Sequence, residues 1–129
     1  MTTDFCDAAK RHMEDADFLF DNSRLANADH LYGFAAECAL KAVINESGTT
    51  PEWIHINKLW DQFITFANGR KESHYATTLG EENSFKDWKI EQRYHIRSSI
   101  HPEIVIKHQQ AAKKTMQILD TMIFNQGIQ

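Results

Sequence analysis

Residues 31–44 carry apolar, aromatic or small side chains around almost the whole circumference of a helix, and this feature constrains the fold more than any other. Their only charges are Glu37 and Lys41, which are four residues apart in the order that favours an ion pair on a helix. A helix without a polar face is covered by its neighbours on most sides, so we expect it at the centre of the fold. Gly33 and the alanines of this stretch allow those neighbours to approach closely.

The ends of the expected helices are marked by residues with known positional preferences. Asp29 is the expected N-cap of the central helix over residues 30–45, and Gly48 with Pro51 closes that helix. Asp4 is the expected N-cap of the first helix.

The remaining apolar residues recur at spacings of three and four, and no segment alternates as a strand does. We assign helices to residues 5–20 and 59–67, to a segment that starts with a capping-box-like run at 84–87, and to about 22 residues from Pro102. The polar stretch 69–83 is either a loop or partly helical. The sequence therefore predicts an all-α fold in one domain over residues 1–129, an antiparallel bundle of four main helices plus a shorter fifth.

The composition is that of an ordinary globular protein, with 42% hydrophobic and 25% charged residues. No apolar run approaches the roughly 18 residues that a membrane span needs, and the first residues are acidic rather than basic and apolar. We therefore expect a cytoplasmic chain without membrane contact. In that compartment Cys6 and Cys38 are expected to be ordinary thiols rather than a disulfide pair.

The charge of the chain is unevenly distributed. Residues 1–85 hold seven Lys and Arg against 14 Asp and Glu, whereas residues 86–114 hold seven against three, a balance of +4. The net charge of −4 argues against a general nucleic-acid coat protein. The cationic segment 86–114 either binds a polyanion or matches the acidic half of the same chain or of a second subunit.

The central helix resembles a known family. Residues 32–42 read YGFAAECALKA, which resembles the AAECALKA signature of HEPN domains, a group of compact helical bundles. His55 ahead of an apolar third helix, and Arg93-Tyr94 ahead of a long last helix, are also similar to the pattern of that family. The resemblance implies a homodimeric helical domain that binds a nucleotide, RNA or a partner protein of the minimal nucleotidyltransferase type. Many members are metal-independent ribonucleases, often toxins, and others have lost catalysis.

Ribonuclease members of the family carry an arginine followed, after four to six residues, by a histidine. Histidine suits the general base that deprotonates the 2′-hydroxyl, and arginine stabilises the charge that develops on the phosphate. Here Arg93 and Arg97 precede His101 with seven and three intervening residues, so the motif is kept only approximately. These three are the candidate catalytic residues, and the candidate binding residues are Tyr94, His95, Lys89 and Lys107.

The resemblance therefore favours a non-catalytic binding module. The alternatives are a ribonuclease with this degenerate motif and a purely structural interaction bundle. A plainer interpretation of the cationic stretch is a polar turn in which the arginines pair with Glu91 and Glu103.

Histidines and aromatic residues also have plain interpretations. The seven histidines include no HExxH pattern, so we expect no metal and no cofactor, and His12 and His108 lie on apolar stripes as core residues. Tryptophans and phenylalanines at helical spacing indicate a core rather than a base-stacking platform. Trp53, in a loop beside Pro51, is instead expected at a dimer seam.

Overall fold

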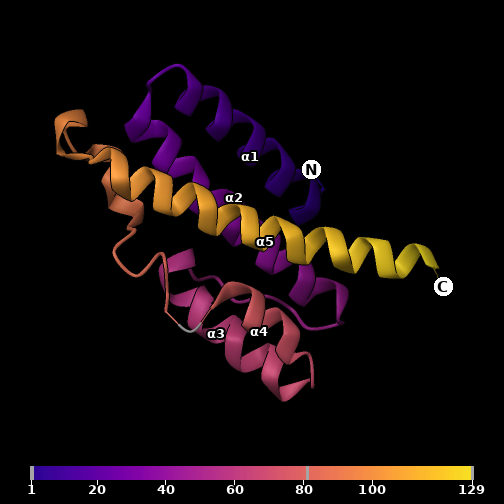
Figure 1. Cartoon of the computed structure of the whole chain (residues 1–129). Coiled ribbons are helices and arrows are strands. Elements are labelled where there is room, and N and C mark those ends of the chain that lie inside the picture. Colours follow the sequence, from indigo (N-terminus) through magenta and orange to yellow (C-terminus); the bar gives the residue numbers. More distant parts are fainter. Residues whose placement is uncertain (1, 81, 129) are drawn as a thin grey trace.

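The computed structural model describes residues 2–80 and 82–128, and within them the chain forms helices and no strand (Figure 1). The five α-helices are α1 (Phe5–Asp21), α2 (Leu25–Glu46), α3 (Ile56–Gly69), α4 (Ser73–Leu79) and α5 (Pro102–Ile128). Two short 3₁₀ helices, η1 (Ile90–Tyr94) and η2 (Arg97–Ser99), lie between α4 and α5. The all-α prediction is confirmed for these residues. None of the helices described is both long and apolar enough to cross a membrane.

Helix α2 occupies the centre and packs mainly against α1 and α5, as its apolar circumference predicts (Figure 1). Glu37 and Lys41 of this helix are buried and form the predicted ion pair, at 3.3 Å. The largest fully buried side chains of the core include Tyr32, Leu40, Trp60, Phe63, Phe85 and Trp88. Two of the three tryptophans are therefore core residues, whereas Trp53, in the loop between α2 and α3, is fully exposed.

The main helices are not all antiparallel to their neighbours. Helices α1 and α2 form an antiparallel hairpin (Figure 1). Helices α2 and α5 run in the same direction, because His108 contacts Asp29 near the starts of both helices and Gln126 contacts Glu46 near their ends. This differs from the uniformly antiparallel arrangement that we predicted. The reason is that residues 47–101, between the two helices, bring the chain back to the start of α2 before α5 begins.

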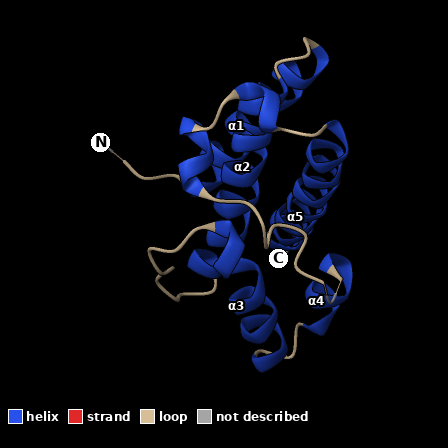
Figure 2. Ribbon diagram, turned by 90° about the vertical axis from the view of Figure 1, so that its left-hand side faces the viewer, coloured by secondary structure: helices blue, strands red, loops and turns tan. Residues whose placement is uncertain are grey.

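Helices α3 and α4 form a pair that lies below α1 and α2 in Figure 2. Phe63 of α3 and Tyr75 of α4 are both buried, with their ring centres 6.3 Å apart. Helix α4 falls within the polar stretch 69–83, so the partly helical alternative is confirmed and the loop alternative is wrong.

Helix α2 begins at Leu25, earlier than we predicted. Asp29 is not its N-cap, because it lies in the second turn and is buried. Ser23, with a φ of 60°, makes the tight turn that connects α1 to α2. Arg24 is then the N-cap residue of α2, and its side chain makes no capping hydrogen bond. Asp4 does cap α1 as predicted, since its carboxylate accepts a backbone N–H at 2.9 Å.

The prediction of a helix that starts at 84–87 is wrong. Turns and the two 3₁₀ helices occupy this region instead, and α5 then begins at Pro102 as predicted. The physical reason lies at Asn83, whose buried side chain accepts the Phe85 N–H at 2.9 Å and donates to the Asn57 carbonyl at 2.8 Å. Hydrogen bonds from a side chain to nearby backbone compete with those of a helix.

Candidate functional site

Two adjoining cavities lie where the start of α2 meets η1, η2 and the first turns of α5. The inner cavity, of about 150 Å³, is lined by Asp29, Asp87, Lys89, Gln92, Ser99, Ile104 and His108 and by four shared residues. The basic cleft, of about 580 Å³, is lined by residues 23–27, by Arg97 and by the same four shared residues. The shared residues are Ala26, His95, Ile96 and Ile100. The two cavities are therefore neighbours with a wall in common.

Trp88 anchors the segment that builds both cavities to α2. Its indole is fully buried and donates from Nε1 to the carbonyl oxygen of Asp29 at 3.2 Å. Gly33 provides the space, because a Cβ at that position would lie 2.5 Å from Cζ2 of Trp88 and closer still to Cε2 and Nε1. The segment then reaches Pro102, before which helical backbone is disfavoured, so the cavity wall stays irregular.

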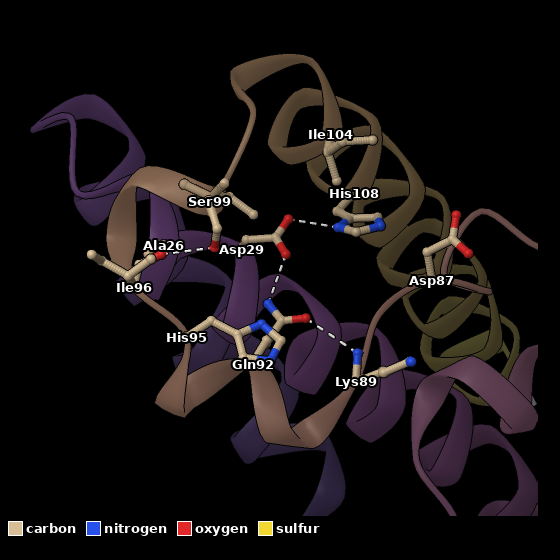
Figure 3. Close-up of a pocket in the computed structure, with 11 residues that line it drawn as sticks. Ala26, Asp29, Asp87, Lys89, Gln92, His95, Ile96, Ser99, Ile104 and His108 are labelled. Atoms are coloured by element: carbon tan, nitrogen blue, oxygen red, sulfur yellow. Dashed lines mark hydrogen bonds and ion pairs between the residues drawn. The ribbon is translucent and has the colours of Figure 1, made fainter.

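A buried carboxylate, that of Asp29, lines the inner cavity and lies between Gln92 and His108 (Figure 3). Oδ1 of Asp29 is 2.6 Å from Nδ1 of His108, and Oδ2 accepts from Nε2 of Gln92 at 2.8 Å. Oε1 of Gln92 in turn accepts the backbone N–H of Lys89 at 3.2 Å, which fixes the orientation of the amide. Asp29 and His108 are 1% and 3% exposed. Hydrogen bonds to both carboxylate oxygens offset the cost of burying this acid.

The basic cleft is lined by cationic, polar and apolar groups. Arg24 from the turn before α2 and Arg97 from η2 line it together with His95, and none of the described residues in its lining is acidic. Helix α2 begins here without a side-chain cap, so its first N–H groups add partial positive charge. Leu25 and Ile96 supply apolar wall. Two guanidinium groups beside an apolar wall can bind the phosphate of an organic phosphate ligand.

The predicted site residues only partly come together. Arg97 and His95 line the basic cleft, and Lys89 and His95 line the inner cavity. Arg93 belongs to neither lining; its guanidinium stacks 4.9 Å from the ring centre of Tyr94, and that ring is 77% exposed.

The other two predicted residues lie farther along the chain. His101 is exposed just ahead of α5, Lys107 is half-buried on α5, and neither lines the two cavities. As the alternative interpretation of the cationic stretch expects, residues 93–101 form an irregular, mostly exposed turn region. Its ion pairs with Glu91 and Glu103 do not form within the part of the chain that the structure describes.

Sequence reasoning missed Arg24, Asp29 and Gln92 as site residues. His108 is a core residue as predicted, while His12 is half-buried against an aromatic ring 5.8 Å away. His108 alone gave a signal for the inner cavity, because a histidine on an apolar stripe needs a buried partner, whereas Asp29 has the position of an N-cap in the expected helix 30–45. The sequence does not show that these two residues are each other's partner.

A second polar cluster covers another part of α2. Glu37 accepts from Lys41 and lies 2.9 Å from Nδ1 of His55. His30 stacks on the Trp88 indole at 5.4 Å, and its own Nδ1 is buried without a hydrogen-bond partner among the described residues. Burial, followed by the nearby Arg93 guanidinium, lowers the pKa of His30.

Cysteine and metal chemistry receive little support from the geometry. Cys6 and Cys38 are free and half-buried, and burial raises the pKa of the Cys38 thiol to about 11. A thiol with this pKa stays protonated and unreactive at neutral pH. Across residues 2–80 and 82–128, no three His, Cys, Asp or Glu side chains are grouped so as to hold a metal ion.

Comparison of the chain with models of protein families, with curated proteins and with solved structures found no match. The resemblance to HEPN domains therefore rests on residues 32–42, on His55 and on Arg93-Tyr94.

Proposed function

We propose that this chain is a non-catalytic, HEPN-like module that binds the phosphate groups of a nucleotide or RNA in the basic cleft. The observation that carries the proposal is the pairing of Arg24 with Arg97 in one cleft that also contains His95. The described lining of this cleft is free of acidic residues, although the chain as a whole has a net charge of −4. Because the rest of the protein is anionic, a local excess of guanidinium groups favours binding of one anionic ligand at this cleft over general binding of polyanions to the whole surface.

The surroundings of the two arginines fit an RNA-like ligand. Guanidinium groups bind phosphate in a bidentate manner, and the apolar residues Leu25, Ile96 and Ile100 beside them suit the less polar faces of sugar and base. Tyr94, exposed on the same irregular segment, provides a ring on which a base can stack.

A homodimer and a nucleotidyltransferase-type partner are parts of the proposal that come from the HEPN resemblance. The interface of this homodimer is proposed at the loop between α2 and α3, where Trp53 is fully exposed and free to contact a second copy.

Binding is favoured over ribonuclease activity by the position of His101. A general base must lie within hydrogen-bonding reach of the hydroxyl that it deprotonates. His101 does not line the cleft that contains Arg97, and Arg93 is stacked on Tyr94. The three residues of the degenerate motif therefore do not share one cavity.

The proposal is tested by measuring the affinity of single-stranded RNA of about 12 nucleotides by fluorescence anisotropy at fixed salt. We expect Arg24→Glu and Arg97→Glu each to weaken binding at least tenfold, because each removes a charge-assisted contact to phosphate. Lys58→Glu makes the same change of charge at an exposed residue of α3 that lies outside both cavities, and should alter affinity less than about threefold. Equal losses in all three variants, or no binding by the wild type, would overturn the proposal. Absence of binding would leave a protein-binding role.

A further inference from the structure

An open groove, here called the α3 groove, lies between the loop that follows α2 and the exposed face of α3. It has a volume of about 480 Å³ and is lined by Ile44, Thr49, Thr50, Pro51, Glu52, Asp61, Gln62, Thr65 and Phe66. The α3 groove has no lining residue in common with the basic cleft or the inner cavity. The proposed phosphate site therefore does not use it.

Trp53 lies directly beside the α3 groove but does not fill it. It follows Pro51 and Glu52, which line the groove, yet its own side chain is 100% exposed. The other two tryptophans, Trp60 and Trp88, are fully buried. Resting on the homodimer proposed above, we propose that the α3 groove of each copy receives the Trp53 indole of the other copy.

The exchange of two indoles follows from the position of the groove and of Trp53 on one surface. A two-fold axis brings the same patch of two copies together, so the indole of each copy enters the groove of the other. A partner of different sequence covers both the indole and the groove only if it carries its own matching pair. A second copy of this chain carries that pair already.

The chemistry of the α3 groove suits an indole. Its apolar side chains can cover a ring, and its charged lining residues, Glu52 and Asp61, can only accept when ionised. An indole is a large apolar ring with one N–H donor and no acceptor. Oε2 of Glu52 accepts from Nε2 of Gln62 at 3.2 Å, which fixes the loop on α3. The described lining contains no Lys or Arg, so the two carboxylates disfavour RNA or an acidic peptide there.

The area involved predicts a weak dimer. Two indoles bury about 300–500 Å² of their own surface, and the grooves that cover them lose a similar area. The exchange therefore accounts for about 600–1,000 Å² of interface, below the range of about 1,200–2,000 Å² that is typical of stable complexes. We expect a dimer that dissociates on dilution, with Trp53 as its main contact.

NMR spectra of the ¹⁵N-labelled chain at increasing dilution test the exchange, because they detect weak association. The Trp53 indole N–H resonance and the amide resonances of residues 61–66 should shift together as the concentration falls. Thr65→Arg places a long cation in the groove and, like Trp53→Ser, should weaken the dimer at least about tenfold. Thr77→Arg is the matched control and should dimerise like the wild type. Thr77 is exposed on α4 outside the groove, and its hydroxyl donates to the carbonyl four residues earlier, as that of Thr65 does.

A mixture of two variants distinguishes insertion into the groove from any other contact of Trp53. Labelled Trp53→Ser keeps the groove, and unlabelled Thr65→Arg keeps the indole. Adding the second to the first should shift residues 61–66, whereas adding unlabelled Trp53→Ser should not. A Thr65→Arg dimer as strong as the wild type, or no shift in the mixture, would overturn the exchange and leave the homodimer in place. A wild type whose spectrum does not change with concentration would refute the homodimer as well, and the RNA affinities of the Arg24 and Arg97 variants test the phosphate cleft separately.

Discussion

Replacing Gly33 with alanine tests how the site is fixed to the scaffold. The added Cβ would lie 2.5 Å or less from three atoms of the Trp88 indole, a distance that real Cβ atoms do not tolerate. Trp88 is fully buried, and its neighbours on this side include the stacked ring of His30. The indole must therefore move, and the hydrogen bond from its Nε1 to Asp29 is stretched or lost.

The expected cost combines three terms of known sign. Overpacking a buried site costs about 1–3 kcal/mol, and loss of the Trp88 hydrogen bond costs about 1 kcal/mol more. Alanine gains about 1 kcal/mol over glycine in a helix interior, which opposes both. The net destabilisation is about 1–3 kcal/mol, which lowers the melting temperature by about 4–12 °C in a domain of this size.

Gly69→Ala is the matched control. Gly69 is the last residue of α3, its φ is not positive, and a Cβ there meets nothing within 4 Å. We expect it to be neutral or slightly stabilising. Thermal and urea unfolding followed by circular dichroism compare the two variants, and RNA affinity is measured on the folded fraction. If Gly33→Ala is as stable as Gly69→Ala and binds RNA like the wild type, Trp88 does not hold the 84–101 segment on α2.

Three further predictions concern titration, assembly and catalysis. Burial lowers the pKa of His30 below its usual 6.5, so on acidification the unfolded chain takes up a proton that the folded chain refuses, and stability falls as the pH drops below about 6.5. The melting temperature of His30→Gln should therefore fall less between about pH 7 and pH 5 than that of the wild type; an equal fall contradicts this assignment. The homodimer proposed above should be seen in sedimentation analysis of the wild type and lost in Trp53→Ser, whose melting temperature should stay within about 2 °C; a monomeric wild type or an unchanged dimer in the variant contradicts the proposed seam. Mixed RNA in EDTA should stay intact with the wild type, and cleavage that disappears in His101→Ala would establish the ribonuclease alternative.

The central helix and its ion pair were predictable from the sequence because the patterns that specify them lie within one short segment. The apolar circumference of residues 31–44 specifies a central helix, and the pair Glu37 and Lys41 is defined by a spacing of four within that helix. The direction of α5 relative to α2 depends instead on the path of the chain through residues 47–101, for which no local pattern in the sequence gives a direction.

The 84–101 segment was not predictable because a tertiary contact outweighs its local preference. Serine followed by charged residues at 84–87 resembles a helix start, but the Asn83 side chain bridges Phe85 and Asn57 across two segments. The inner cavity was hidden for a related reason. Asp29 has the residue type and position of an N-cap, and only the earlier start of α2 reveals it as a buried acid paired with His108.

The central claim is that the ligand phosphate binds in the cleft that Arg24 and Arg97 both line, and NMR titration with the short RNA tests it most directly. If the cleft binds the phosphate, backbone amide resonances of residues 24–27 and 95–100 move together and saturate. Resonances around the cavity of about 360 Å³ between α4 and α5, which includes His74 and Asp120, should stay in place. Shifts confined to that other cavity, or no shift at residues 24–27, would contradict the account.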